Sequence, residues 1–256
     1  MQLTEQLRTD LETLQAARVF FAHQSIGSNI LDGLTVLARE GGVSLHINPP
    51  DRLGDAPGIT QGIAGRNGDP ESKIQYFADR MASFASVPRV ALMKFCYVDF
   101  TASTNSDVVF QHYERAMRSL QQTYPSVTFV HVTVPLTTRP SSFKDTVKRL
   151  MGRPVRKDEA NARRAAFNQR LRAAFKDQRV FDLARVESTR PDGTLENFRS
   201  RDGMAAAALF RGYTSDGGHL NEFGRRLAAT EFARVVAAAL VGTQPASSTH
   251  PPYLAR

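Results

Sequence analysis

The residues whose spacing best suits chemistry lie toward the C-terminal end of the chain. Asp216 and His219 stand three positions apart, separated by two glycines, in the segment SDGGHLN. A carboxylate bonded to one imidazole nitrogen fixes the tautomer of the ring, so that the other nitrogen can take a proton from a hydroxyl group. The two glycines free the turn from steric restriction. The spacing predicts an acid–base pair, although it is also typical of a polar turn ahead of a helix.

A hydroxyl group that such a base would serve lies near the N-terminal end. Ser25 follows the apolar run Arg18–Ala22, close to where a helix is expected to begin. Serine is a weak nucleophile that needs an adjacent base, and the N–H groups and positive dipole at the start of a helix favour an anion beside it. A serine at this place is also a common helix cap. Its combination with Asp216 and His219 indicates nucleophilic catalysis.

The elements that must position these residues alternate along the chain, as in an α/β domain with a parallel sheet. We expect strands at Arg18–Ala22, Val43–Ile47, Arg89–Phe95, Val127–Val134 and Val180–Leu183, and helices at Ile30–Arg39, Glu71–Phe84, Asp107–Tyr124, Asp158–Lys176 and Leu220–Leu240. The prediction is one domain over residues 1–242, a three-layer α/β/α sandwich with a flavodoxin-like five-stranded parallel sheet. Residues 243–256 are expected to form a flexible tail. Ligands bind beyond the carboxyl ends of parallel strands, where Ser25 and the Asp216–His219 pair both fall.

A long segment rich in Gly, Pro and Asp, from Asn48 to Pro70, follows the second expected strand. Loops of this length are usually functional when they carry no secondary structure of their own. Its last third, GIAGRNGDP, contains Gly65 and Asn67. It therefore belongs with the candidate site.

These motifs together resemble the SGNH/GDSL hydrolases over nearly the whole chain. HQSIGSN resembles the family's first block, with His-Gln in place of the usual Gly-Asp, GIAGRN resembles the second, and SDGGHLNEFG matches the fifth. The resemblance implies that Ser25 is the nucleophile, His219 the general base and Asp216 its orienting carboxylate. It also implies that the N–H of Gly65 belongs to the oxyanion hole.

The third block departs from the family pattern. Cys96-Tyr97-Val98-Asp99 stands where Gly-x-Asn-Asp is expected, so that Val98 replaces the oxyanion-hole asparagine. Losing one such donor typically lowers turnover by about 10²–10³. Asn67, two residues after Gly65, is the nearest substitute. Asn67 is also typical of an ordinary turn before a helix.

Composition and charge exclude several other classes. The net charge is +8, but the arginines are spread along expected helices without interleaved aromatic residues, which argues against nucleic-acid binding. Cys96 is the only cysteine, so no internal disulfide forms. Neither metal-ligand spacing nor a cofactor motif is present, and we expect no metal and no cofactor. No stretch is long and apolar enough to span a membrane. Lys94, in an apolar strand, is expected to pair with Asp99 or to point into the cleft.

The sequence thus predicts a metal-independent serine esterase or deacetylase that acts on a small or carbohydrate-linked ester through an acyl-enzyme. Two alternatives stay open: an O-acyltransferase with the same triad, and a non-catalytic binding module that has lost the oxyanion asparagine. No signal peptide is visible, so a cytoplasmic location is the default, with secretion if a signal was trimmed. The sequence defines neither the oligomeric state nor the acyl group.

Overall fold

The sheet that organises the fold is parallel throughout. In the computed structural model, which describes residues 3–52 and 56–242, five strands lie in the order β2-β1-β3-β4-β5. They are β1 (Arg18–His23), β2 (Gly58–Ile63), β3 (Val90–Met93), β4 (Thr128–Val132) and β5 (Arg179–Phe181). This order confirms the predicted α/β fold with a flavodoxin-like sheet. The predicted tail at 243–256 lies outside the described residues.

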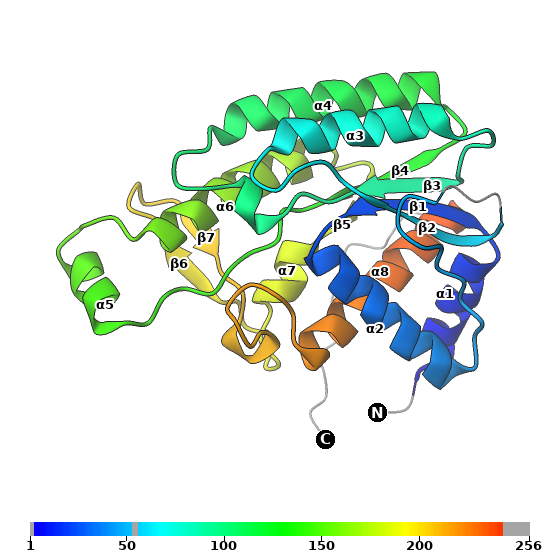
Figure 1. Ribbon diagram of the computed structural model, residues 1–256. Helices are drawn as coiled ribbons and strands as arrows, with labels where there is room; N and C mark the ends of the chain where they lie inside the picture. The colour runs from blue at the N-terminus through cyan, green and yellow to red at the C-terminus, as the bar shows by residue number, and fades with distance from the viewer. Residues whose placement is uncertain (1–2, 53–55, 243–256) are drawn as a thin grey trace.

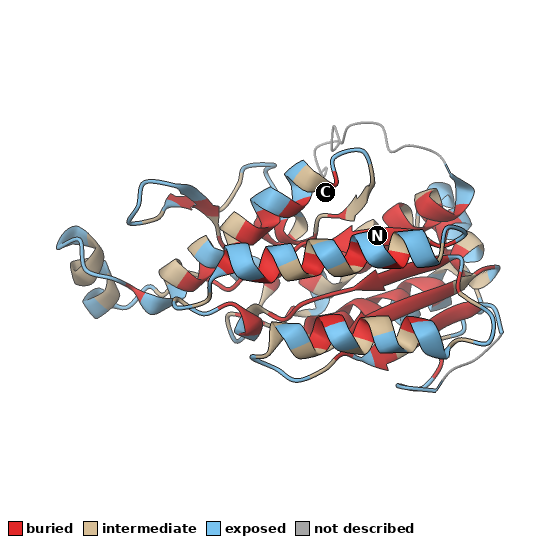
Figure 2. Ribbon diagram, turned by 90° about the horizontal axis from the view of Figure 1, so that it is seen from above, coloured by how far each residue is buried: buried red, intermediate tan, exposed pale blue. Residues whose placement is uncertain are grey.

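Helices cover both faces of the sheet (Figure 1). One layer contains α1 (Glu5–Gln15), α2 (Ile26–Gly41), α7 (Leu183–Ser188) and α8 (Glu222–Val241), and the other contains α3 (Pro70–Ser83), α4 (Ser106–Thr123) and α6 (Arg156–Ala174). Successive strand residues point to opposite faces. In β1, Val19 and Phe21 therefore pack into the first layer, and Phe20 and Ala22 into the second. Figure 2 shows buried residues on the strands and exposed residues on the outer faces of the helices.

The second strand does not lie where the sequence predicted it. Val43–Ile47 forms only an isolated bridge from Ile47 to Ile59, whereas β2 pairs along its whole length with β1 from within the segment expected to be a loop. Gly58 explains the arrangement, because its φ is +119° and an added Cβ would lie 2.3 Å from the His46 carbonyl oxygen. The expected strand thus runs along the outer edge of β2 as irregular chain. Two glycines and two polar residues in the sequence GITQGI hide β2 from a search for apolar runs.

Several further elements have no counterpart in the prediction. They are α1, α5 (Phe143–Leu150), α7, the hairpin β6 (Asn197–Arg199) with β7 (Ala205–Ala207), and the 3₁₀ turns η1 (Tyr97–Asp99) and η2 (Arg211–Tyr213). Helix α5 has no buried residue and stands apart from the sheet in Figure 1. Helix α2 begins at Ile26, directly after Ser25, rather than at Ile30. The carboxyl end of β1 is therefore joined to α2 by a very short turn.

Candidate active site

Ser25 occupies the turn between β1 and α2 in an unusual backbone conformation. Its φ is +54° and its ψ is −106°, and only Asp51 shares a positive φ among the non-glycine residues that the structure describes. Such a conformation costs about 1–3 kcal/mol and persists where the surroundings impose it, often at functional sites. Gly27 makes the turn possible, because a Cβ there would lie 2.3 Å from the Cβ of His23. The turn sets Ser25 at the carboxyl edge of the sheet.

The structure brings three of the sequence-predicted residues into one chain of hydrogen bonds. Ser25 Oγ lies 2.6 Å from His219 Nε2, and His219 Nδ1 lies 2.6 Å from Asp216 Oδ2. The other carboxylate oxygen, Asp216 Oδ1, accepts hydrogen bonds of 2.8 Å from the amides of Gly218 and His219. The hydrogen bond from His219 and then these two amides hold the pKa of Asp216 well below its usual range. Asp216 is therefore ionised at neutral pH and suited to orienting the ring.

The loop that carries Asp216 and His219 is anchored on two sides. The Thr138 amide donates to the Gly217 carbonyl at 2.9 Å, and the Leu220 amide donates to Asn29 Oδ1 at 3.0 Å. Asn29 is a buried residue of α2, one turn after Ser25. The same helix thus holds both the serine and the loop of its histidine. The sequence does not reveal this role, because a single asparagine in an apolar stripe belongs to no motif.

Tyr97 closes one side of His219. Its ring meets the imidazole edge-on with centroids 5.8 Å apart, and a Cβ on Gly218 would lie 2.9 Å from it. The buried Arg164 side chain donates to the Tyr97 carbonyl, at 2.8 Å from Nη2 and 3.1 Å from Nε. Glycine at 218 is therefore required for the tyrosine to approach the loop.

Gly65 lies beside the end of β1. The Gln24 side chain donates to the carbonyls of Ala64 and Gly65 at 2.7 and 2.6 Å, and Gly65 has a φ of +50°. A Cβ at Gly65 would lie 2.6 Å from Ser72, so only glycine fits. Within the described chain, the amides of Ser25 and Gly65 donate to no protein acceptor, and both therefore remain free to bind an oxyanion.

Asn67 is held by a buried ion pair that sequence analysis did not predict. Lys73 Nζ donates to Asn67 Oδ1 at 3.0 Å and to Asp99 Oδ2 at 2.8 Å, and the Lys73 and Asp99 side chains are fully buried. Asp99 also accepts from the amides of Gly68 and Cys96. Since the carbonyl oxygen of the Asn67 amide is engaged by Lys73, its NH₂ group remains as an exposed donor. Val98, which stands where the sequence resemblance led us to expect an asparagine, is 39% exposed and offers no side-chain donor.

Lys94 is not the partner of Asp99. Its ammonium group is fully buried and donates to the Phe95 carbonyl at 2.8 Å, and burial lowers its pKa. The signal that would have identified Lys73 instead is its place in the apolar stripe of α3, four residues before Phe77. His23 is buried, its Nε2 donates to Gln61 Oε1 at 3.1 Å, and its pKa is lowered to about 4 by burial and by Lys94. It is neutral at physiological pH.

Other site types have little support in the described part of the chain. Residues 3–52 and 56–242 contain no group of three or more His, Cys, Asp or Glu residues placed to hold a metal ion. None of the helices described there is long and apolar enough to cross a membrane.

Comparison with known proteins reveals likeness in structure rather than in sequence. No protein-family model and no curated protein matches the chain. An acetyl esterase variant with a bound acetate ion matches at a TM-score of 0.52 and 12% identity, over 88% of this chain and 99% of that one. A carbohydrate esterase of family 3 from Talaromyces cellulolyticus matches at 0.52 and 11%, over 89% and 100%. These similarities show that the chain shares the α/β fold of the two esterases.

Proposed function

We propose that this protein is a serine-dependent ester hydrolase that acts through an acyl-enzyme. The observation that carries the proposal is the chain of two 2.6 Å contacts that links Ser25 through His219 to Asp216. Ser25 Oγ attacks the ester carbonyl while His219 Nε2 takes its proton. His219 then returns the proton to the leaving alcohol, and Asp216 keeps the imidazole in the required tautomer. In the second half of the reaction, His219 takes a proton from a water molecule, which attacks the carbonyl of the acyl-enzyme. The acid is released, and Ser25 Oγ recovers its proton from His219.

The negative charge that develops on the carbonyl oxygen needs donors opposite His219. We assign this role to the amides of Ser25 and Gly65, together with the side-chain NH₂ of Asn67. Val98 stands where the resembling family has its asparagine, but Lys73 of the Lys73–Asp99 pair engages the side-chain oxygen of Asn67 and leaves its NH₂ group as the donor that we assign. Side-chain and backbone donors of this kind are each worth about 10²–10³ in turnover.

The solvent exposure of the His219 and Asp216 side chains favours hydrolysis over acyl transfer. The His219 and Asp216 side chains are 44% and 57% exposed, so water has access to the base. An O-acyltransferase must keep water away from its acyl-enzyme. The contacts that join Ser25, His219 and Asp216 also favour an enzyme over a non-catalytic binding module, since ligand binding alone does not require them. The acetyl esterase and the carbohydrate esterase among the similar structures support a small or carbohydrate-linked ester as substrate.

Hydrolysis of p-nitrophenyl acetate tests the proposal. Ser25→Ala and His219→Ala should each lower kcat by about 10³-fold or more while leaving the unfolding transition in place. Retention of wild-type turnover in both variants would exclude the mechanism. Product analysis with and without an added sugar acceptor separates hydrolysis from transfer, since a transferase would form acetylated sugar in preference to acetate.

A further inference from the structure

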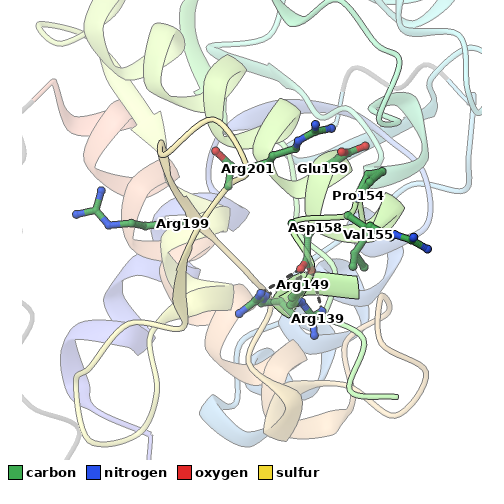
Figure 3. Close-up of a pocket in the computed structure, with 11 residues that line it drawn as sticks. Arg139, Arg149, Pro154, Val155, Asp158, Glu159, Arg199 and Arg201 are labelled. Carbon is green, nitrogen blue, oxygen red and sulfur yellow. Dashed lines mark hydrogen bonds and ion pairs between the residues drawn. The ribbon is translucent and has the colours of Figure 1, made fainter. Parts of the chain in front are cut away.

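A strongly basic cavity of about 290 Å³ lies between the start of α6 and the β6–β7 hairpin (Figure 3). Its charged lining consists of five arginines and two carboxylates: Arg139, Arg149, Arg153, Arg199, Arg201, Asp158 and Glu159. Figure 3 shows the Arg199 side chain on the far side of the hairpin, away from the others. Without Arg199, the lining still contains four arginines and two carboxylates. The cavity therefore carries a net positive charge.

The floor of this cavity is a rigid group of three residues. Asp158 Oδ2 lies 2.6 Å from Arg149 Nε and 3.0 Å from Arg139 Nη2. Burial alone would raise the pKa of Asp158, but the hydrogen bonds from the two arginines lower it overall. The Arg139 guanidinium also lies 4.4 Å from the centroid of the Phe198 ring. These contacts fix the orientation of both guanidinium groups before any ligand arrives.

The arginines keep donors that no residue of the described chain uses. Arg149 directs Nε and Nη2 to Asp158 and to the Pro140 carbonyl, and Arg139 directs Nε and Nη2 to Asp158. Nη1 of each has no protein acceptor among the described residues. The exposed Arg153 and Arg201 likewise form no ion pair there. Unused donors on arginines that line one cavity suit an oxyanion, since the planar guanidinium matches carboxylate and phosphate groups.

The cavity is connected to the candidate active site through the backbone. Arg139 directly follows Thr138, whose amide donates to the Gly217 carbonyl in the loop of Asp216 and His219. Arg211 Nη2 also donates to the Arg139 carbonyl at 2.6 Å, and η2 leads directly into that loop. Two hydrogen bonds therefore join the Thr138–Arg139 segment at the cavity to the segment that leads into and contains the Asp216–His219 loop.

We propose that this cavity binds an anionic group, a carboxylate or a phosphate, carried by the ester substrate. The inference rests on the proposed hydrolase function, because it assigns the charge of that enzyme's substrate. Asp158 does not repel the anion, because two guanidinium groups already neutralise it. The fixed arginines of the floor orient the group, and Arg153 and Arg201 add charge at the rim.

Direct binding to the Ser25→Ala variant tests the inference without any turnover. The probes are acetylated glucuronate, acetylated glucose 6-phosphate and neutral acetylated glucose, each titrated calorimetrically. We expect at least one of the anionic esters to bind at least tenfold more tightly than the neutral ester. The variant Arg153→Glu/Arg201→Glu should abolish this preference, whereas Arg115→Glu, on exposed α4 surface away from the cavity, should keep it. The anionic probe that loses affinity identifies carboxylate or phosphate as the preferred group.

The results separate this inference from the proposed function. Equal affinity for all three esters, or an equal loss in the Arg115→Glu control, would overturn the anion site even if the wild-type protein hydrolyses every probe. Conversely, an intact charge preference in a protein without esterase activity would leave the anion site standing and refute the hydrolase. With wild-type Ser25, the double variant should lower kcat/KM at least tenfold for the anionic ester and leave p-nitrophenyl acetate unchanged.

Discussion

Asn29 accepts a hydrogen bond from the backbone amide of Leu220 at 3.0 Å, across 191 residues of sequence. The bond is buried, and it joins the helix that follows Ser25 to the loop that carries His219. The hydrogen bond thus constrains the distance between Ser25 and His219 through a residue that need not touch a substrate. This relationship makes Asn29 a positioning residue.

Replacing Asn29 with alanine should lower kcat about tenfold with little change in KM for p-nitrophenyl acetate. The substitution leaves the Leu220 amide buried without an acceptor, which costs about 1–3 kcal/mol and loosens the loop. Asn29→Asp keeps the acceptor oxygen and should restore most of the rate. A purely structural role would instead give a destabilised protein whose folded fraction turns over at the wild-type rate.

Asn67→Asp separates the structural contact of Asn67 from its proposed role in the oxyanion hole. An aspartate keeps the oxygen that accepts from Lys73 but loses the NH₂ donor, so the protein should remain folded while kcat falls about 10²-fold. Adding Val98→Asn, which restores the donor at the family's position, should recover part of the rate. Unchanged turnover in Asn67→Asp would remove Asn67 from the oxyanion hole.

Glu187 should make the free energy of unfolding depend on pH. It is fully buried, its Oε1 has no partner in the described chain, and burial raises its pKa to about 8. Because the pKa is higher in the folded protein than in the unfolded chain, the wild type loses stability as pH rises from about 4.5 to about 8. Glu187→Gln removes this loss.

Urea denaturation at several pH values measures the effect. The two proteins should be similarly stable below pH of about 4.5, and the variant should be more stable by on the order of 5 kcal/mol above pH 8. A constant difference between the proteins across this range would show that Glu187 is ionised when folded, paired electrostatically with Arg164 and Lys94.

The proximity of Ser25, His219 and Asp216 could be predicted from the sequence because each of these residues belongs to a local motif. Asp216 and His219 share one turn, and Ser25 follows a strongly apolar strand, so the topology of a parallel sheet brings them together. The same reasoning assigned the wrong residues to the second strand. The position of β2 is set by its backbone hydrogen bonds to β1 and by the close approach of Gly58 to the His46 carbonyl. Neither of these produces a periodic pattern of side chains in the sequence.

The supporting residues could not be predicted for a different reason. Lys73 pairs with Asp99 and Asn67 through contacts between separate elements, and sequence spacing gives no distance between a helix and a turn from another part of the chain. Lys94 was the more conspicuous lysine, since it interrupts an apolar strand. It nevertheless bonds to a neighbouring carbonyl instead. Buried polar partners depend on packing geometry that local sequence does not carry.

Covalent labelling with a fluorophosphonate, followed by peptide mass spectrometry, tests directly whether Ser25 is an activated nucleophile. Such a probe reacts with a serine that an adjacent base activates. We expect one adduct on Ser25 in the wild-type protein, strong loss of labelling in His219→Ala, and none in Ser25→Ala. An unlabelled wild-type protein, or an adduct on another residue with Ser25 unmodified, would contradict it.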